Sequence, residues 1–158
     1  MALIHSLLMG AVAGMRAMTP LAAVTNAARL GALPVGNGAP RLLSNRLAAH
    51  GAIAIAGREL VGDKQRSAPD RIAPAGLAVR IATGAIAGAA LAPRRQRAAA
   101  AALGAAAAVG TAYLAFELRK RATARYGQVA TGAVEDAVTL AGAALVVASA
   151  SRRSRRRR

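Results

Sequence analysis

Five apolar stretches, separated by short polar segments, run along the chain and predict its helices. They cover residues 1–28, 47–62, 75–93, 98–116 and 128–150. The stretch 98–116 has no charged residue, and a helix of this length measures about 28 Å, close to the hydrocarbon thickness of a bilayer. A soluble bundle would need charged helix faces, which residues 81–93 and 137–150 cannot supply. The pattern therefore predicts an all-α, polytopic membrane helical bundle with four or five apolar helices.

Residues 1–28 predict an uncleaved first membrane helix. No charge precedes Arg16, whereas a secretory signal carries basic residues ahead of its apolar run. Gly10 and Gly14 are four residues apart, so they share a face at which another helix backbone can come close. Pro20 lies one turn beyond Arg16, and we expect it to kink or end this helix.

The next stretches are less regular. Residues 29–46 hold prolines and glycines throughout, which predicts a loop with a short interfacial helix at 41–45. The uncharged run 47–57 is shorter than a spanning helix requires. The helix at 47–62 is therefore the one that could be re-entrant, and whether it crosses the bilayer stays open.

Glycine and arginine recur every four residues in the third stretch and line one stripe of its helix: Gly76, Arg80, Gly84 and Gly88. The small residues allow a neighbouring helix to press close, and an arginine on such a stripe needs an acid to pair with. We expect Glu59 or Asp63 to be that acid, with Glu135 and Asp136 as the next candidates.

The distribution of arginines predicts the organisation and orientation. We expect one membrane-embedded domain, 1–150, and a disordered Arg-rich tail, 151–158. The tail and the basic turn 94–97 favour a cytoplasmic C-terminus by the positive-inside rule, although the basic segment 119–125 would then face the other side. The expected location is the bacterial inner membrane, which the chain crosses several times.

Composition adds two points. Apolar residues make up 55% of the chain and aromatic residues only 2%, so alanine must fill the core, as suits a bilayer, where close helix approach holds helices together. The net charge of +16 predicts anionic partners, and we expect lipid headgroups near the tail. No aromatic stacking platform for a specific nucleic acid is present. The composition is also compatible with a homo-oligomer.

Enzymatic chemistry is not indicated. The chain has no cysteine, and its two histidines, His5 and His50, belong to no catalytic or metal-binding motif. Glu59 and Asp63 could share a cation from one helix face, but Lys64 and the excess of arginine oppose this. We therefore expect no enzyme activity, no metal and no cofactor.

Charged residues within or beside the apolar stretches are the candidate functional residues, because a charge in a bilayer costs several kcal/mol unless paired or hydrated. The expected intramembrane polar cluster comprises Arg16, Glu59, Asp63, Lys64, Arg71, Arg80, Glu117, Glu135 and Asp136. The expected helix-packing glycines are Gly10, Gly14, Gly76, Gly84 and Gly88. The charges either form structural ion pairs or line a polar cavity or ion path.

Several of these residues also carry a family resemblance. They stand in the segments Gly14-Met-Arg16-Ala-Met-Thr-Pro20-Leu21, Glu59-Leu-Val-Gly-Asp63-Lys64 with Pro69-x-Arg71, Gly76-Leu77-x-x-Arg80 with Gly84-Ala85, and Glu135-Asp136. Together these segments resemble small bacterial membrane proteins of the domain-of-unknown-function 4126 family over most of residues 10–147. The resemblance implies an integral membrane protein of unsettled function and assigns no catalytic residue. The chain departs from the pattern at Arg66, where a proline is expected.

Two classes of function follow. One is a small transporter or channel-like protein whose polar site is built from Arg16, Glu59, Asp63 and Arg80. The other is a non-catalytic membrane scaffold or anionic-lipid-associated protein whose internal ion pairs are structural. A water-reachable cavity shared by Glu59 and Arg80 would favour the first class.

Overall fold

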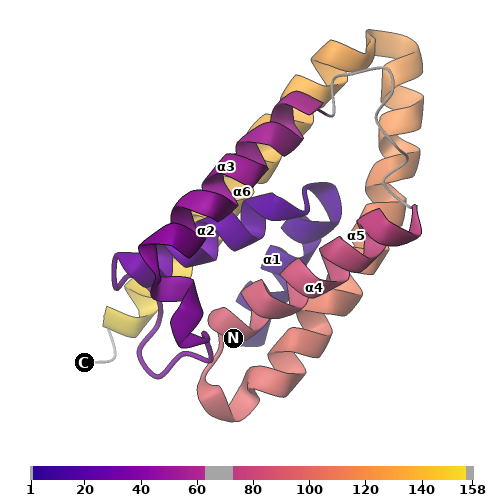
Figure 1. The fold of residues 1–158 in the computed structure, drawn as a ribbon. Coiled ribbons are helices and arrows are strands. Elements are labelled where there is room, and N and C mark those ends of the chain that lie inside the picture. The colour runs from indigo at the N-terminus through magenta and orange to yellow at the C-terminus, as the bar shows by residue number, and fades with distance from the viewer. Residues whose placement is uncertain (1, 63–72, 156–158) are drawn as a thin grey trace.

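The computed structural model describes residues 2–62 and 73–155, with side chains as far as Arg152, and this part of the chain is all α-helical (Figure 1). Its helices are α1 (Ala2–Met15), α2 (Met18–Arg29), α3 (Arg46–Gly62), α4 (Pro74–Ala90), α5 (Arg97–Tyr126) and α6 (Gln128–Arg155), with two short 3-10 helices, η1 (Arg41–Ser44) and η2 (Arg94–Gln96). The all-α prediction is therefore confirmed, and η1 coincides with the short helix expected at 41–45. Asp63, Lys64 and Arg71 lie outside the described residues.

Two long helices form the frame of the molecule. α5 and α6 meet at Gly127, whose φ of 82° lies in the left-handed region that glycine adopts without a Cβ clash. From this corner the two helices diverge, as Figure 1 shows. α1 and α4 pack on α5 and on each other, whereas α2 packs against both α3 and α6.

The first apolar stretch is not one helix. α1 ends at Met15 and α2 begins at Met18, so the chain breaks at Arg16 and Ala17. Pro20 is the third residue of α2, in the first turn, where a missing N–H costs no helical hydrogen bond. The break lies one turn earlier than expected, because the proline starts the second helix instead of ending the first.

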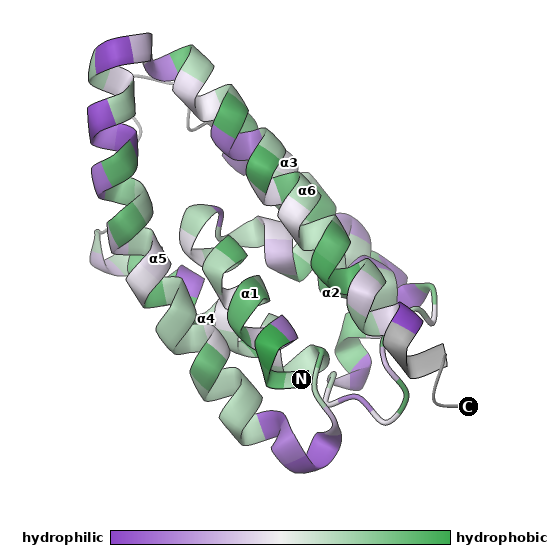
Figure 2. Cartoon of the chain, turned by 180° about the vertical axis from the view of Figure 1, so that it is seen from behind, coloured by the Kyte–Doolittle hydropathy of each residue, from purple (hydrophilic) through white to green (hydrophobic). Residues whose placement is uncertain are grey.

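A loop and a turn pair at one end of the molecule. The N–H of Gly38 donates to the carbonyl of Ala92 at 2.7 Å, and the N–H of Arg94 donates to the carbonyl of Gly36 at 3.0 Å. These bonds join the loop between α2 and η1 to the turn between α4 and η2. We call this the paired-loop end, and Figure 2 shows polar residues at this end and at the opposite corner between α5 and α6.

The start of α1 and the end of α2 both lie towards the paired-loop end. The hydroxyl of Ser6 near the start of α1 donates to the carbonyl of Gly88 at 2.8 Å, near the end of α4. Just beyond α2, the carbonyl of Ala32 accepts a hydrogen bond from the hydroxyl of Ser151 on α6. The break itself lies inside the bundle, because Gly14 packs against Ala108 and Thr111 about halfway along α5. The segment that turns back is thus α1–α2, whereas residues 47–62 form the uninterrupted helix α3.

Helix contacts are made by small residues. The buried residues of α5 recur mostly every four positions: Ala100, Gly104, Ala108, Ala112 and Ala115. A Cβ added to Gly84 would lie 2.7 Å from the carbonyl oxygen of Gly104, and one added to Gly88 would lie 2.6 Å from that of Ala100. Gly10 contacts Gly104 from α1 in the same way. Gly76, another of the expected packing glycines, accepts a hydrogen bond from Arg80 through its carbonyl.

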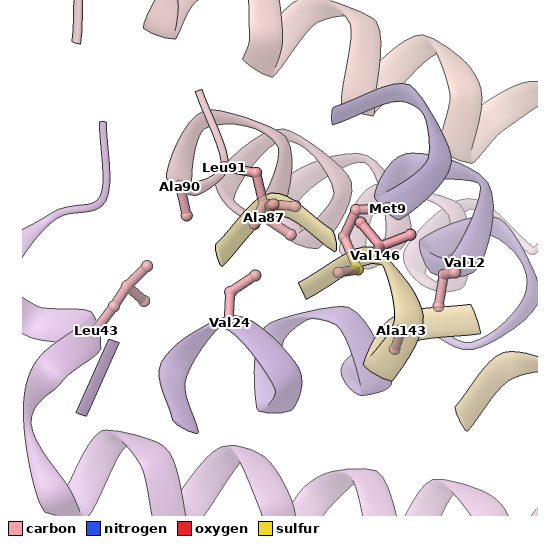
Figure 3. Packing of buried hydrophobic residues seen from close by; sticks show 10 residues of the cluster. Met9, Val12, Val24, Leu43, Ala87, Ala90, Leu91, Ala143 and Val146 are labelled. Atoms are coloured by element: carbon pink, nitrogen blue, oxygen red, sulfur yellow. The ribbon is translucent and has the colours of Figure 1, made fainter. Parts of the chain in front are cut away.

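Large apolar side chains lie mostly on the outside. The buried apolar residues are largely alanines, joined by a few larger side chains such as Met9, Val24 and Val146. These three belong to one buried cluster, whose side chains Figure 3 shows. In contrast, Leu114, Val134 and Leu145 are 59%, 65% and 65% exposed. This distribution is the reverse of that in a soluble core, where large aliphatic residues are buried.

Two described helices are long and apolar enough to cross a membrane. The two segments that meet these criteria of length and composition are Arg94–Tyr126 and Gln128–Arg152. Only 22% and 33%, respectively, of the most apolar 18 residues of each segment are buried inside the molecule. α1 and α4 are apolar but shorter. The expectation of a membrane bundle with four or five apolar helices is therefore not confirmed, and two helices meet the length and composition of a span.

The C-terminal boundary also differs from the expectation. α6 continues through Ser151 to Arg155, so the helix does not end at residue 150. The hydroxyl of Ser151 also donates to the carbonyl of Val147 at 2.8 Å, one turn earlier. Because each added residue completes a further helical hydrogen bond, extending α6 costs little once the preceding turns are formed.

Candidate functional site

The break between α1 and α2 leaves backbone groups without helical partners, and charged side chains satisfy them. The carboxylate of Glu59, near the end of α3, accepts hydrogen bonds from the N–H groups of Ala17 at 2.8 Å and Met18 at 2.9 Å. A carboxylate at the positive end of a helix dipole is favourable, and it also satisfies N–H donors of the first turn. Glu59 therefore acts as the N-terminal cap of α2.

Arg80 binds a backbone carbonyl on the other side of the break, at the end of α1. Its Nε donates to the carbonyl of Gly14 at 3.2 Å, in the last turn of α1, and its Nη1 donates to the carbonyl of Gly76 at 3.1 Å. The residue is only 6% exposed. An arginine on α4 thus holds a carbonyl that the end of α1 leaves without a helical donor.

Arg16 occupies the break and is 1% exposed. Its Nη2 forms an ion pair with Oδ1 of Asp136 on α6, and its Nη1 lies 3.5 Å from the carbonyl oxygen of Glu59. The side chain therefore connects the break to both α6 and α3. We call Arg16, Glu59, Arg80 and Asp136 the break-point cluster.

The expected ion pair between Arg80 and Glu59 is wrong. Both carboxylate oxygens of Glu59 are bound to the N–H groups at the start of α2, and the described bonds of Arg80 go to backbone carbonyls. The charges are matched to backbone groups that the break exposes, and residue spacing alone does not show such groups. The alternative partner, Asp63, lies outside the described residues.

Glu135 and Asp136 are neighbours in sequence, but their side chains pair with residues of different segments. Asp136 meets Arg16, whereas Glu135 accepts a hydrogen bond from Nη1 of Arg119 on α5 at 3.1 Å. Successive helical residues point about 100° apart, since a turn contains about 3.6 residues. The second ion pair therefore lies outside the break-point cluster, between α5 and α6.

Two further residues differ from the sequence expectation. Glu117 is exposed on α5 and contributes nothing to the cluster, although it was expected there. Arg119 was not among the candidates, because it stands in a basic run that is typical of a solvated helix end. The acid at position 135 is the only feature of the sequence that could have suggested its role.

Glu59 and Arg80 share an open pocket of about 580 Å³. Among the described residues its other lining includes Ala17 and Met18 at the start of α2 and Val79 on α4. The pocket thus reaches the N-terminus of α2 and the carboxylate that caps it. Both charged residues therefore border one open pocket.

Thr19, the second residue of α2, is a buried polar residue next to the break. Its hydroxyl is buried and finds no hydrogen-bond partner among the described residues. In contrast, the hydroxyls of Thr25, Thr83 and Thr139 each donate to the carbonyl four residues earlier in their own helix. For Thr19 that residue would be Met15, and the break interrupts the helix between the two.

No group of three or more His, Asp or Glu side chains gathers within the described residues. No set of ligands for a metal is therefore assigned there. A scan against protein-family models, a search of curated proteins and a search of solved structures each find no match to the chain.

Proposed function

We propose that the protein is a small integral membrane protein with a transporter-like or channel-like polar site at the helix break. α5 and α6 cross the bilayer, and α1–α2 is a re-entrant unit whose tip holds the break-point cluster. The observation that carries the proposal is the broken helix, capped by Glu59 and Arg80, beside a pocket that both residues line.

The exposed apolar surface supports the membrane location. Leu114, Val134 and Leu145 lie on helices of spanning length, with alanine and glycine between the helices. Lipid solvates such large side chains, and small residues allow the close helix contacts that a bilayer favours. The location proposed is the bacterial inner membrane, with the C-terminus cytoplasmic and the tail arginines at anionic headgroups.

The broken helix supports the transport part of the proposal. Membrane transporters place substrate and ion sites at discontinuous helices, where helix ends direct their dipoles into the bilayer. Non-helical backbone is tolerated there only when protein groups or a water-filled cavity satisfy it. Here the carboxylate of Glu59 is held by Ala17 and Met18 and also borders the pocket. A neutral side chain at position 59 would hold these N–H groups less tightly, so the charge of Glu59 links the site to the geometry of the break.

Single-cysteine labelling tests whether water reaches the site, and the natural chain has no cysteine to remove. We expect Met18→Cys and Val79→Cys to react with a water-soluble maleimide in intact proteoliposomes. Leu145→Cys, 65% exposed but facing lipid in this proposal, and Ala87→Cys, fully buried, are the controls and should not react. If Met18→Cys and Val79→Cys are as unreactive as the controls, the hydrated site is refuted.

A flux measurement then separates transport from mere hydration. Proteoliposomes containing the protein should dissipate an imposed pH gradient faster than protein-free liposomes, and Glu59→Gln should remove that difference. An exposed acid replaced in the same way, Glu117→Gln, is the matched control and should leave the flux unchanged.

A scaffold without transport is the second candidate, and one observation favours it. Both oxygens of Glu59 are bound to backbone N–H groups, so this carboxylate is already satisfied by the protein itself. Labelling at Met18→Cys without any flux would support this candidate. The resemblance to the domain-of-unknown-function 4126 family is compatible with both candidates.

A further inference from the structure

A second cavity lies on the other side of the molecule from the paired-loop end, just below the corner where α5 meets α6. It has a volume of about 660 Å³, within the range of about 300–1,000 Å³ typical of ligand pockets. Leu114, Leu118, Ala122 and Tyr126 of α5 form one wall, and Val134 and Val138 of α6 are on the other. We call this cavity the corner groove, and most of its lining is apolar.

One basic residue, Arg119, lines the corner groove, and two more, Arg121 and Arg125, directly precede its lining residues Ala122 and Tyr126 in the sequence. The Arg119–Glu135 ion pair joins its two walls. Closer to the corner, the guanidinium carbon of Arg125 lies 5.6 Å from the centroid of the Tyr126 ring, which lines the groove. Arg121 is one turn before Arg125, so two like charges share one helix face. Neither forms an ion pair with any described residue, and both are exposed.

The depth of the groove in the proposed bilayer fits an amphipathic ligand. The uncharged run of α5 ends at Phe116. Arg121 follows five residues later, about 7.5 Å further along the helix axis, which is the scale of one headgroup layer. The groove therefore extends from the hydrocarbon edge at Leu114 into the layer where phosphates lie.

We propose that the corner groove binds one anionic phospholipid. An acyl chain lies between α5 and α6, and the phosphate binds the guanidinium groups of Arg121 and Arg125, which donate charge-assisted hydrogen bonds to its oxygens. Charge complementarity favours this occupant over a second copy of the chain, because a second copy would bring the same basic helix end to the groove. The proposal rests on the membrane location but not on transport through the break-point cluster.

Lipid retention in detergent tests the site. The protein is purified in a non-ionic detergent, supplied with phosphatidylglycerol or phosphatidylcholine of equal chain length, and examined by native mass spectrometry and thermal melting. We expect one phosphatidylglycerol to be retained in preference to phosphatidylcholine, with a rise in melting temperature of several degrees. The double variant Arg121→Gln/Arg125→Gln should lose the preference at least tenfold while melting normally without lipid.

Two further variants separate the alternatives. Arg94→Gln/Arg95→Gln removes the same charge at the paired-loop end and should keep the preference for phosphatidylglycerol. Val134→Trp places a bulky ring in the groove and should reduce retention of both lipids.

Equal retention of phosphatidylglycerol by the parent and the Arg121→Gln/Arg125→Gln variant would overturn the proposal. So would a dimer that dissociates on Val134→Trp substitution, because a second copy would then occupy the groove. Loss of the preference with unchanged proton flux would show that the lipid site and the break-point cluster are independent.

Discussion

At the scale of single residues, the charges of the break-point cluster compensate for a missing turn of helix. Glu59 holds N–H groups of Ala17 and Met18, Arg80 holds the carbonyl of Gly14, and Arg16 pairs with Asp136. Each of these groups would be costly to bury without a partner, because low dielectric strengthens the penalty for an unsatisfied polar group. The cluster therefore explains how a polar turn is tolerated in the middle of an alanine-rich bundle.

The Arg16–Asp136 ion pair gives the prediction at this scale. Arg16→Met leaves the Asp136 carboxylate buried and should lower the free energy of unfolding by about 3–5 kcal/mol, as breaking a buried pair does. The double variant Arg16→Met/Asp136→Leu should recover much of this loss, because both charges of the pair are then removed. Unfolding in mixed detergent measures both effects.

An exposed acid provides the control. Glu117→Leu should change the free energy of unfolding by less than about 0.5 kcal/mol, as surface substitutions commonly do. If the double variant is no more stable than the sum of its two single variants predicts, the pair is not the interaction that holds the break to α6.

At the scale of helices, the fold depends on close backbone contact. α1 and α4 both reach Gly104 of α5, one through Gly10 and the other through Gly84. At such a contact a side chain would separate the helices, so the absence of a Cβ is what allows dispersion contacts along the whole stripe. The repeat of small residues every four positions in α5 places one continuous stripe against two neighbours.

Gly104 and Gly110 provide a matched pair of substitutions on one helix. A Cβ at Gly104 would meet the backbone oxygen of Gly84, whereas a Cβ at Gly110 would meet nothing within 4 Å. Gly104→Ala should therefore destabilise the protein by about 1–3 kcal/mol, as overpacking does. Gly110→Ala should be neutral or stabilising by up to about 1 kcal/mol, because alanine favours a helix more than glycine. Melting temperatures in one detergent compare them, and a Gly104→Ala variant as stable as Gly110→Ala would contradict the close packing.

At the scale of the whole molecule, basic segments that are distant in sequence meet at one end. The loop 30–40, which lies between Arg29 and Arg41, pairs with the turn that carries Arg94 and Arg95. Ala32 in this loop also accepts a hydrogen bond from the C-terminal part of α6. The segment with Arg119 and Arg121 lies at the opposite end of α5. Because the positive-inside rule favours the larger gathering of arginines on the cytoplasmic side, we propose that the paired-loop end faces the cytoplasm.

Side-specific labelling tests this topology. Ser44→Cys and Gln96→Cys, both in 3-10 helices at the paired-loop end, should react with an impermeant thiol reagent only in inverted membrane vesicles. Ala124→Cys, in the last turns of α5, should react only in right-side-out vesicles. Extraction at alkaline pH should leave the protein in the membrane fraction. Labelling of Gln96→Cys and Ala124→Cys from the same side would rule out a crossing by α5.

The sequence by itself determined the helical class, the long apolar segments of α5 and α6, and the small residues on the stripe of α4. These features depend on composition and on periodicity within one segment, so local spacing is enough to predict them. It also indicated that Arg16, Glu59, Arg80 and Asp136 matter, because charges in apolar stretches are costly wherever they lie.

Only the tertiary structure decided which groups these charges meet. The partner of Glu59 is the start of α2, and the partner of Arg80 includes the end of α1, because the break exposes backbone groups there. The convergence of Gly10 and Gly84 on Gly104 likewise depends on which helices become neighbours. Such choices are non-local: a side chain satisfies whichever polar group the packing of other helices brings within reach, and spacing along one helix carries no information about that neighbour.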